Sequence, residues 1–592
     1  MGCKTAEESS GVKEKKTIVS VALWGDQLME GYAPYLQEQF PEVEFEFYVA
    51  TNSTDYYRFR HEKEALADIM TVRRFSLNDV KSMKDDLMDL SDTELANTFY
   101  QAYLRNYTYD DGTVNWLPAC AEVDSLILNK TLFEENQIPI PTDYASFLAA
   151  CEQFEALGIQ GFASDYVNDF TCMELLQGLS AKELTSADGR RWRQDYESGK
   201  EAGLDREVWM PVFDKMQDFI EHMQLQAENT DDTITEVLDK FEAGKLAMYR
   251  GTGADVLRFR EAGEPLLMPY FGDDSEDNWY LTYPAFQAAA KKTEDSEREK
   301  LILDIMSCML SEKGLEQIAT GQNMVAYNKG VQLELLPELE NLNSYIEDNR
   351  LFVRLASSEM FAVSKEVVHK MMSGELESAE SAYEYFDARL REEEDKETAD
   401  ITIEKGYDYS FDPESGSEAA SALANSVREE TGAELLLCQA SDVAGEIRPG
   451  AYQEQEVGYI LRGESLRVFH AEMTGQEIKA FLNRALEKKG QRGCVVNDSN
   501  LYVSSGFEME IQKEKNGYTV EKLTVQGKPM KQEQVYHMDI LSGEHYFAGI
   551  ILPELGIDYT LQEETVKELI VQRLVGERKQ LAEPTDYITL QE

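Results

Sequence analysis

The segment from Gly112 to Phe147 constrains this chain most, because it has the pattern of a connection between two α/β lobes. The apolar run Leu126–Leu128 suits a buried strand. Turn-forming residues then interrupt the pattern as far as Pro141. An amphipathic helix follows, with Thr142 as its expected N-cap and Gly158 as its stop. We therefore expect an extended segment that leaves one lobe, passes a hinge and starts a second lobe.

Length and charge narrow the possibilities further. At 592 residues the chain is too long for one core, since single cores stop growing near roughly 250–300 residues, and we expect two or three domains. The formal net charge of −55 would repel a phosphate backbone, which argues against nucleic acid as a partner. No run approaches about 18 consecutive apolar residues, so we expect no helix that spans a membrane.

The first hundred residues alternate between strand and helix patterns. Thr17–Leu23 and Val43–Val49 read as strands, separated by the amphipathic segment Leu28–Phe40. Ala67–Val72 reads as a third strand that ends at a pair of arginines. This order favours a doubly wound parallel sheet.

Beyond the hinge, strand and helix patterns continue to alternate. Ile159–Ala163 reads as a strand, and the pair Thr233 and Glu236 has the spacing of a capping box before an inward-facing helix and the strand Leu246–Tyr249. The segment Asn278–Pro284 is expected to cross back to the first lobe. Apolar residues spaced from Leu376 to Leu390 predict a final helix.

Two stretches carry a resemblance to a known family. The first is Pro118, the apolar run, Asn129-Lys130 and Pro139–Thr142, and the second is the helix-Gly-strand element Phe241–Tyr249. In this order they resemble the extracellular solute-binding proteins of bacterial ABC importers, especially the maltose-binding-protein-like, sugar-binding branch. The resemblance implies a two-lobed α/β fold of the periplasmic-binding-protein-like (type II) kind.

A different pattern begins near Thr398. Helix is expected over Ala419–Glu430, and Ser504–Lys513 with Tyr518–Val525 reads as a hairpin around Asn516-Gly517. The region resembles the C-terminal domain of 5′-nucleotidases, an α+β domain. The stretches that carry this resemblance are Ala422–Asn425, Glu430–Ala433, Gly445–Arg448 with Gly450, Met473–Ile478, Ser505–Phe507 and Val525–Pro529.

These patterns divide the chain into a leader, a solute-binding protein and a C-terminal domain. The expected ranges are 1–16 for the leader, 17–397 for the solute-binding protein (lobe 1 about 17–119 and 284–335, lobe 2 about 124–280 and 336–397), and 398–592 for the 5′-nucleotidase-like domain.

The nucleotidase resemblance does not extend to catalysis. The family's separate metallophosphoesterase domain carries the signatures D-x-H, G-N-H-D/E and G-H-x-H, and none of them occurs in this chain. The six histidines are scattered along the sequence and no C-x-x-C occurs, which argues against a zinc site. We therefore expect no catalytic residue, no metal, no cofactor and no nucleotidase activity. The cysteines are expected to be free, buried thiols.

Nucleotide recognition is also expected to be lost. In the simplest alignment Leu461-Arg462-Gly463 replaces a turn that holds one stacking Phe, and no Phe precedes the second loop at Ser542. Val443 stands in place of a base-binding Asn. Base stacking contributes about 1–3 kcal/mol per base, so the loss of both rings is substantial. Arg448, which remains, is then expected to be a structural ion-pair partner.

The solute-binding half keeps the residue types of a sugar site, namely aromatic platforms with carboxylates and arginines. The resemblance implies contacts at strand ends, on the hinge segment and on the return crossing: Trp24, Asp26, Arg73, Arg74, Glu122, Asp165, Tyr166, Tyr249, Arg250, Trp279 and Tyr283. For each, a structural role is the alternative, with Tyr249 and Tyr283 in the core and Asp165 as a helix cap. Ala254 stands where many sugar binders have a Trp.

The chain begins Met-Gly-Cys3, followed by a polar stretch. The family resemblance implies that Cys3 carries a lipid anchor; the alternative is an ordinary cysteine in a disordered leader. The expected function is therefore a lipid-anchored, cell-surface substrate-binding protein that hands a sugar or similar polar solute to an ABC permease. The alternatives are a surface lipoprotein whose C-terminal domain binds nucleoside, glycan or protein, and a nucleotide-processing enzyme.

Overall fold

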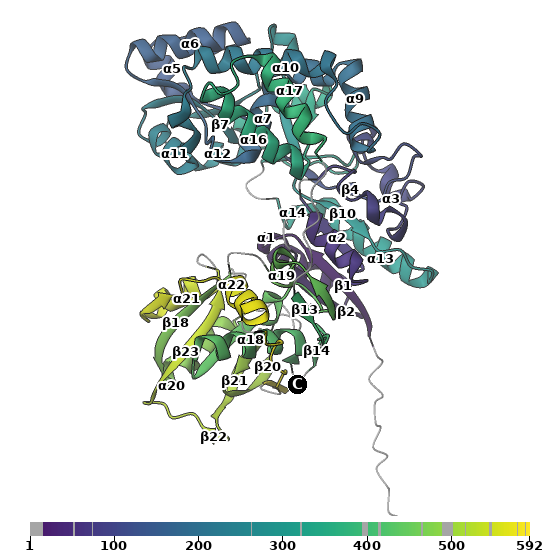
Figure 1. Cartoon of the computed structure of the whole chain (residues 1–592), viewed down its shortest axis with the longest axis vertical. Coiled ribbons are helices and arrows are strands. Elements are labelled where there is room, and N and C mark those ends of the chain that lie inside the picture. Colours follow the sequence, from purple (N-terminus) through teal and green to yellow (C-terminus); the bar gives the residue numbers. More distant parts are fainter. Residues whose placement is uncertain are drawn as a thin grey trace, which may run out of the picture.

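A computed structural model describes most of the chain as three bodies (Figure 1). We name them lobe 1, lobe 2 and the C-terminal domain. The described residues are 16–50, 54–73, 75–261, 263–319, 323–392, 401–412, 416–462, 466–487, 501–514, 517–543, 547–576, 578–585 and 588–591. Within these ranges no helix is both long and apolar enough to cross a membrane.

Lobe 1 is built on a five-stranded sheet in the order β2-β1-β3-β10-β4. Successive residues of a strand point to opposite sides of this sheet. Val19 and Val21 pack against α1 (Asp26–Gln39) and α13 (Ser296–Met309), whereas Ala22 packs on the other side, against α2 (Thr54–Glu62). Its elements are β1 (Thr17–Leu23), α1 (Asp26–Gln39), β2 (Val43–Val49), α2 (Thr54–Glu62), β3 (Ile69–Val72), η1 (Lys81–Asp86), α3 (Glu94–Asn97), α4 (Gln101–Leu104), η2 (Arg105–Tyr107), β4 (Leu117–Pro118), β10 (Gln287–Ala290), α13 (Ser296–Met309) and α14 (Glu312–Glu316).

Lobe 2 surrounds a seven-stranded sheet whose central strand, β5 (Cys120–Asn129), pairs with four others. Leu126 and Leu128 face the helical core while Ile127 faces the opposite side. The strands are β6 (Gln160–Ala163), β7 (Leu246–Thr252), β8 (Pro265–Met268), β9 (Tyr280–Pro284), β11 (Met324–Ala326) and β12 (Leu351–Val353). The helices are α5 (Lys130–Glu135), α6 (Tyr144–Ala156), α7 (Asp169–Leu179), α8 (Ala181–Thr185), α9 (Ala187–Glu197), α10 (Arg206–His222), η3 (Ala227–Asp231), α11 (Ile234–Glu242), α12 (Gly253–Arg258), η4 (Ser275–Asp277), η5 (Pro337–Leu339), α15 (Leu342–Glu347), α16 (Ser358–Met372) and α17 (Ala379–Leu390).

The C-terminal domain holds a five-stranded sheet, β19-β16-β23-β18-β24, with helices on both faces, and a four-stranded sheet, β22-β21-β20-β25. The strands are β13 (Ile401–Ile403), β14 (Phe411–Asp412), β15 (Gly416–Ser417), β16 (Leu435–Gln439), β17 (Gly450–Tyr452), β18 (Arg467–Thr474), β19 (Tyr502–Ser505), β20 (Glu508–Glu514), β21 (Gly517–Val525), β22 (Lys528–Pro529), β23 (Val535–Ser542), β24 (Tyr559–Leu561) and β25 (Ile588–Gln591). The helices are α18 (Glu418–Thr431), η6 (Ala440–Asp442), α19 (Glu454–Val457), η7 (Gly458–Ile460), α20 (Gly475–Ala485), α21 (Ala548–Leu555), α22 (Val566–Val571) and η9 (Gln572–Gly576).

The C-terminal domain packs against β2 and α2 of lobe 1. Tyr409 Oη donates to the Phe47 carbonyl oxygen (2.8 Å), and Tyr56 Oη donates to that of Ala444 (2.7 Å). Phe59 lies among residues of the C-terminal core, including Tyr452. These contacts are buried and largely aromatic, so the domain is fastened to lobe 1 rather than tethered to it.

Arg60 is a buried polar link in this interface. Its side chain is 3% exposed, and it donates to the carbonyl oxygens of Ala65 (3.0 Å) and Glu446 (2.6 Å). Arg60→Ala is therefore expected to lower the free energy of unfolding by about 1.5–3 kcal/mol, the range for hydrogen bonds to charged groups, measured by urea denaturation. Lys63→Ala is the control, because Lys63 donates to the Ala451 carbonyl (2.6 Å) from a half-buried position, where water can replace the lost hydrogen bond. Equal effects of the two substitutions would contradict this role.

Several local expectations need correction. The first sheet is mixed rather than parallel, because β10 runs antiparallel to both β3 and β4. The N-cap of α6 is Asp143, whose carboxylate accepts from the Ser146 amide, and not Thr142. The strand expected over 504–513 is two strands, β19 and β20, because the chain turns at Gly506 with a φ of 85°. Residues 280–284 form β9 within the lobe 2 sheet.

The cysteines at 120, 151, 172, 308 and 438 are free thiols, as expected. Cys308 is half-buried and the other four are buried. Cys494, like Cys3, lies outside the described residues.

Candidate functional site at the junction of the two lobes

The two sheets of the solute-binding part meet where β4 of lobe 1 runs into β5 of lobe 2. Only Ala119 separates the two strands. At this junction Glu122 on β5 lies directly opposite Tyr283 on β9, as a cross-strand pair. From the lobe 1 side, β1 and β3 end beside it and deliver Trp24 and Arg73. Four residues predicted from the sequence therefore come together, and we call Trp24, Arg73, Glu122 and Tyr283 the interlobe cluster.

Arg73 is the centre of the interlobe cluster. Its guanidinium lies over the rings of Trp24 (5.0 Å to the centroid) and Tyr283 (4.7 Å). One of its nitrogens donates to Tyr283 Oη (2.7 Å) and to Glu122 Oε2 (3.2 Å). Arg73 thus ties lobe 1 to β5 and β9 of lobe 2. The Arg73 side chain is 16% exposed and that of Glu122 is 23% exposed.

The cluster holds polar atoms that a ligand could use. Tyr283 Oη donates a hydrogen bond to Glu122. Burial, followed by the Glu122 carboxylate, raises the pKa of the Tyr283 phenol above its usual value, so it remains a donor. Trp24 Nε1 and Arg73 Nε are buried and have no hydrogen-bond partner among the described residues. A buried donor without a partner is costly, which makes both atoms candidates for contact with a bound solute.

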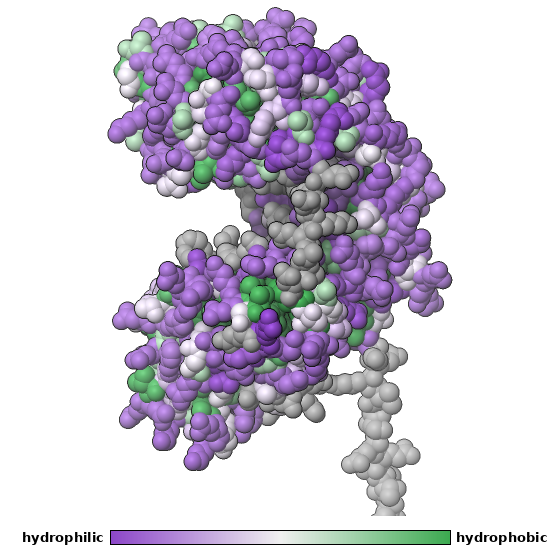
Figure 2. Space-filling view, in the orientation of Figure 1, coloured by the Kyte–Doolittle hydropathy of each residue, from purple (hydrophilic) through white to green (hydrophobic). Residues whose placement is uncertain are grey.

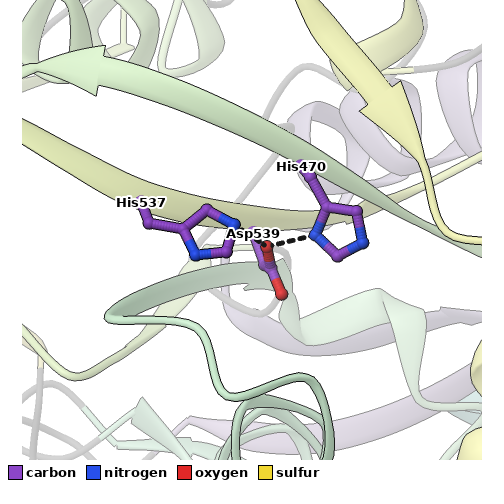
Figure 3. A group of neighbouring side chains, drawn as sticks. All are labelled: His470, His537 and Asp539. Carbon is purple, nitrogen blue, oxygen red and sulfur yellow. Dashed lines mark hydrogen bonds and ion pairs between the residues drawn. The ribbon is translucent and has the colours of Figure 1, made fainter.

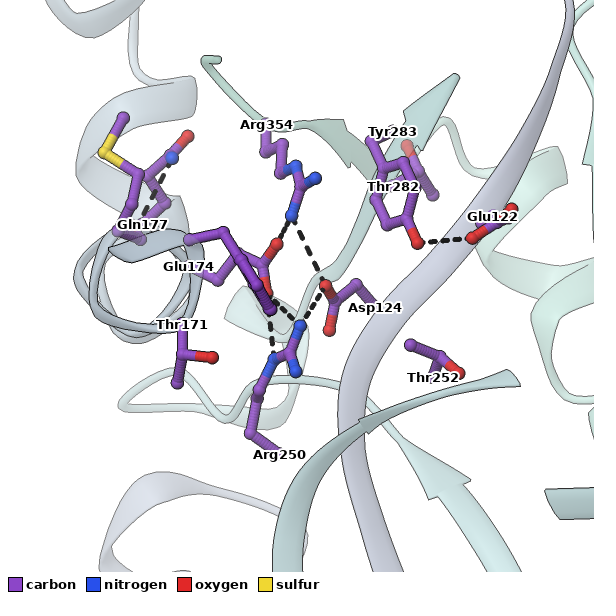
Figure 4. A network of polar contacts seen from close by, with 12 residues as sticks. Glu122, Asp124, Thr171, Glu174, Gln177, Arg250, Thr252, Thr282, Tyr283 and Arg354 are labelled. Carbon is purple, nitrogen blue, oxygen red and sulfur yellow. Dashed lines mark hydrogen bonds and ion pairs between the residues drawn. The ribbon is translucent and has the colours of Figure 1, made fainter. Parts of the chain in front are cut away.

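Behind the cluster lies a buried group of charges, the lobe 2 ion network, which Figure 4 shows in part. Arg250 on β7 contacts Asp124 (2.8 Å) and Glu174, and Asp165 lies 3.7 Å away. Arg354, after β12, contacts Glu174 and lies 3.4 Å from Asp124. The network comprises Asp124, Asp165, Glu174, Arg250 and Arg354.

The lobe 2 ion network is closed to solvent. Arg250 is 6% exposed and Arg354 2%, whereas Glu174 is fully buried. Burial alone would lower the pKa of the Arg250 guanidinium, but the charges of Asp124 and Asp165 outweigh it and raise that pKa. Arg354 also stacks on the Tyr283 ring, with its guanidinium carbon 4.0 Å from the centroid. The network therefore positions Tyr283, and through it the interlobe cluster.

The other predicted contacts do not reach the cluster. Asp165 and Arg250 are buried in the ion network, and Tyr166 is 1% exposed, so none of the three faces an open groove. Tyr249 is fully buried against Phe241 and belongs to the core, which was the alternative role for it. Asp165 and Tyr166 follow β6, whereas Tyr249 and Arg250 lie on β7, which has β5 and β6 as its neighbours in the sheet.

The remaining predicted residues lie elsewhere or outside the description. Trp279 is half-buried and lines a pocket between the lobes, together with Tyr103 and Asn106 of lobe 1 and Phe352 of lobe 2. The pocket holds about 100 Å³, less than the roughly 300–1,000 Å³ of ordinary ligand sites. Asp26 begins α1, and Ala254 is exposed on α12. Arg74 and Cys3 lie outside the described residues.

Sequence reasoning missed Asp124, Glu174 and Arg354. Asp124 had a detectable signal, since it interrupts the apolar stretch of β5 with a charge. Glu174 sits in α7 among residues that are all buried, which also marks it as a partner of a positive charge. Arg354 lies 180 residues from Glu174 along the chain, and only the fold brings them together.

In the C-terminal domain, the residues aligned with nucleotide-binding positions are placed for structure. Arg448 is exposed and pairs with Glu446 (2.9 Å), as expected for an ion-pair partner. Val443 is fully buried in the core. Arg462 donates to Gln439 (3.2 Å). Residues 463–465 and 544–546, which include parts of both aligned loops, lie outside the described residues.

Two α/β lobes joined by adjacent strands, with aromatic rings, an arginine and a carboxylate at their junction, define the class of two-lobed solute-binding proteins. Comparisons with known proteins agree. Residues 72–343 match the family model of bacterial extracellular solute-binding proteins, and residues 401–542 match that of the 5′-nucleotidase C-terminal domain. The chain therefore combines a region similar to bacterial extracellular solute-binding proteins with a region similar to the 5′-nucleotidase C-terminal domain.

Solved structures share the fold of the solute-binding part. A family 1 extracellular solute-binding protein from Bifidobacterium longum subsp. infantis superposes with a TM-score of 0.54 at 16% identity, covering 64% of this chain and 99% of its own. The apo-form of RafE from Streptococcus pneumoniae gives a TM-score of 0.52 at 12% identity, covering 64% and 99%. RafE in complex with raffinose gives 0.50 at 13% identity, covering 63% and 100%. A comparison with curated proteins found no match.

Proposed function

We propose that this protein binds a carbohydrate or a similar polar solute at the interlobe cluster and delivers it to an ABC permease without chemical change. The observation that carries the proposal is the position of Arg73, which leaves lobe 1 and is held by an aromatic ring and a carboxylate of lobe 2. A solute at this point would touch both lobes. RafE, which has the same fold, is known in complex with raffinose.

The residue types suit a sugar. Apolar C–H faces of a sugar stack on Trp and Tyr rings, while hydroxyl groups accept from Arg and donate to a carboxylate. In this structure the two rings face the Arg73 guanidinium. A stacked sugar would therefore displace Arg73 from one ring, and the freed guanidinium would then donate to the solute.

Closure supplies the transport step in this proposal. A solute that bridges the lobes stabilises the closed state through contacts that the open state lacks, and the permease recognises that closed state. We place the protein at the bacterial cell surface, held by a lipid on Cys3. A single acyl chain gives only marginal anchoring, so the anchor would carry more than one chain.

We further propose that the C-terminal domain breaks no bond. A metallophosphoesterase needs two metal ions to activate water and to clamp the phosphate. The chain carries none of that domain's three signatures. Release of phosphate from AMP in the presence of Mn²⁺ would contradict this part of the proposal.

The decisive experiment is a thermal-shift screen of mono- and oligosaccharides on the full chain, followed by titration of the best ligand by tryptophan fluorescence. All five tryptophans lie in the solute-binding part, and Trp24 is in the cluster, so the signal reports on this site. Arg73→Ala is expected to weaken binding roughly 10- to 150-fold, because hydrogen bonds to charged groups contribute about 1.5–3 kcal/mol.

The control for this experiment is Arg206→Ala. Arg206 has the same kinds of partner, since it lies over the Tyr383 ring (5.2 Å) and pairs with Glu380, but it is exposed on the outer side of lobe 2. It should leave binding unchanged. Small-angle scattering should show compaction of the wild-type chain when the solute is added. A solute whose affinity survives both Arg73→Ala and Glu122→Gln would place binding elsewhere and sink the proposal.

A further inference from the structure

Two of the six histidines meet on one face of the five-stranded sheet in the C-terminal domain. His470 on β18 lies directly opposite Asp539 on β23, and His537 precedes Asp539 by two residues on the same strand. Side chains two residues apart on a strand point to the same side. His470, His537 and Asp539 therefore project together, as Figure 3 shows, and we call them the β18–β23 triad.

The donor atoms of the triad are close enough to share one ion. His470 Nδ1 lies 2.6 Å from Asp539 Oδ1, and His537 Nε2 lies 3.7 Å from the same oxygen. The three donor atoms all fall within 4.8 Å of one another. With Zn–N and Zn–O bonds of about 2.0–2.1 Å, ligand atoms of a tetrahedral site stand about 3.3 Å apart. Small side-chain rotations convert the observed spacing into that arrangement.

His470 is oriented by a partner behind it. Its Nε2 lies 2.7 Å from Gln562 Oε1, and the amide nitrogen of Gln562 donates to Glu564 (2.7 Å), which fixes which end of the amide faces the histidine. Nε2 therefore donates to Gln562, and the proton of the Nδ1–Asp539 hydrogen bond is the one that a bound cation would replace. Metal-binding histidines are held in this way, with the second nitrogen donating to a neighbouring oxygen.

The buried carboxylate supplies an independent observation. Asp539 is 0% exposed, and its Oδ2 has no hydrogen-bond partner in the part of the chain that is described. Its ion partners among the same residues are the two histidines. A buried carboxylate oxygen without a partner is costly. A bound cation would give Oδ2 a partner, which no lysine or arginine of the described residues does.

A fourth donor stands next to the triad. Glu472 lies directly opposite His537, on the same face of β18 as His470, and it is exposed. Cross-strand pairs place their Cβ atoms about 4.5–5.5 Å apart, within reach of a glutamate side chain. His537, with 47% of its side chain exposed, leaves the outer side of the site open to solvent.

We propose that His470, His537 and Asp539, with Glu472 as a fourth ligand, form a binding site for a divalent transition metal such as Zn²⁺. Two imidazoles with carboxylates suit such an ion, whereas Ca²⁺ and Mg²⁺ prefer sites made only of oxygen atoms. The site lies in the C-terminal domain, independent of the interlobe cluster. Sequence spacing could not show it, because 67 residues separate His470 from His537.

The test is Zn²⁺ titration of the full chain. The chain carries Cys3→Ser, which removes a competing thiolate. Excess Mg²⁺ is present to saturate weak sites on the acidic surface. Affinity is read by competition with a chromophoric chelator, and Co²⁺ substitution gives a d–d absorption spectrum of the site. One ion per chain is expected. Loss of a residue that only hydrogen-bonds to a metal ligand weakens metal binding roughly 10- to 100-fold. Gln562→Ala should therefore weaken Zn²⁺ binding within that range. His537→Ala, which removes a proposed ligand at an exposed position, should weaken it by more.

His222→Ala is the matched control. His222 is an exposed histidine 3.3 Å from Asp218, but it belongs to no cluster of metal-binding donors in the described chain. It should change neither Zn²⁺ affinity nor the Co²⁺ spectrum. If His537→Ala binds Zn²⁺ as tightly as the parent, or if excess Mg²⁺ abolishes binding in the parent, the site does not exist as proposed. Glu472→Gln should also lower Zn²⁺ affinity if Glu472 is the fourth ligand. Unchanged affinity would mean that the protein supplies only three ligands.

Discussion

Arg354→Met is expected to lower the free energy of unfolding of the solute-binding part by about 3–5 kcal/mol, the usual cost of removing one member of a buried ion group. Arg354 is 2% exposed, and its loss leaves Arg250 alone with the buried carboxylates of Asp124, Asp165 and Glu174. It also removes the group that stacks on Tyr283. Urea denaturation followed by tryptophan fluorescence measures the change, since Trp192 and Trp209 lie in the lobe 2 core.

Two further variants make this prediction specific. Arg206→Met removes an exposed arginine of lobe 2 that pairs with Glu380, and it should leave the unfolding transition almost unchanged. Adding Glu174→Gln to Arg354→Met removes one of the uncompensated carboxylates and should restore part of the lost stability. Arg354→Met with wild-type stability, or no rescue by Glu174→Gln, would show that the network does not stabilise lobe 2.

Asp442→Asn is expected to change how the stability of the C-terminal domain depends on pH. Burial raises the pKa of the Asp442 carboxyl to about 8, and the hydrogen bond from the Gln439 amide (2.8 Å) offsets only part of this effect. Arg462 is 3.8 Å away, beyond hydrogen-bond distance. Between the unfolded pKa near 3.8 and the folded pKa near 8, the folded state binds the extra proton, so wild-type stability falls as pH rises.

Asparagine keeps the oxygen that accepts from Gln439 and cannot ionise. The stability of Asp442→Asn relative to the wild type should therefore rise by up to about 1.4 kcal/mol per pH unit between pH 4.5 and 7.5. Hydrogen exchange of peptides from β16 and β23 follows this domain, which contains no tryptophan. Asp558→Asn removes an exposed charge from the same domain and is the control. A flat difference between Asp442→Asn and wild type would overturn the prediction.

The order and type of the main elements could be predicted from the sequence because local patterns determine them. Alternating apolar residues mark β1 and β2, and the capping box of Thr233 and Glu236 opens α11 as expected. The direction of β10 could not be predicted, because strand pairing depends on a crossover from residues 284–287 that has no local signature. The break at Gly506 could have been suspected, since glycine is the residue that adopts positive φ without strain.

The candidate site likewise has residues that the sequence could indicate and residues that only the fold brings together. Trp24, Arg73, Glu122 and Tyr283 were predicted because the family resemblance places ligand contacts at strand ends and on the hinge, and the structure brings these four side chains together. Asp165 and Arg250 have the same residue types at similar places, yet the structure uses them as buried ion partners. What separates the two outcomes is the presence of Glu174 and Arg354, and that depends on how α7 and β12 pack rather than on any pattern along the chain.

The attachment of the C-terminal domain to lobe 1 offers a way to measure lobe closure. Figure 2 shows a wide hollow between this domain and lobe 2, and the buried links at Tyr56 and Tyr409 hold the domain to lobe 1. Under the proposed hinge motion, the C-terminal domain would move as one body with lobe 1. Its distance from lobe 2 would therefore change on closure. Dyes on α6 and α20, far from the solute, would then report uptake as energy transfer in real time, with every binding side chain left intact.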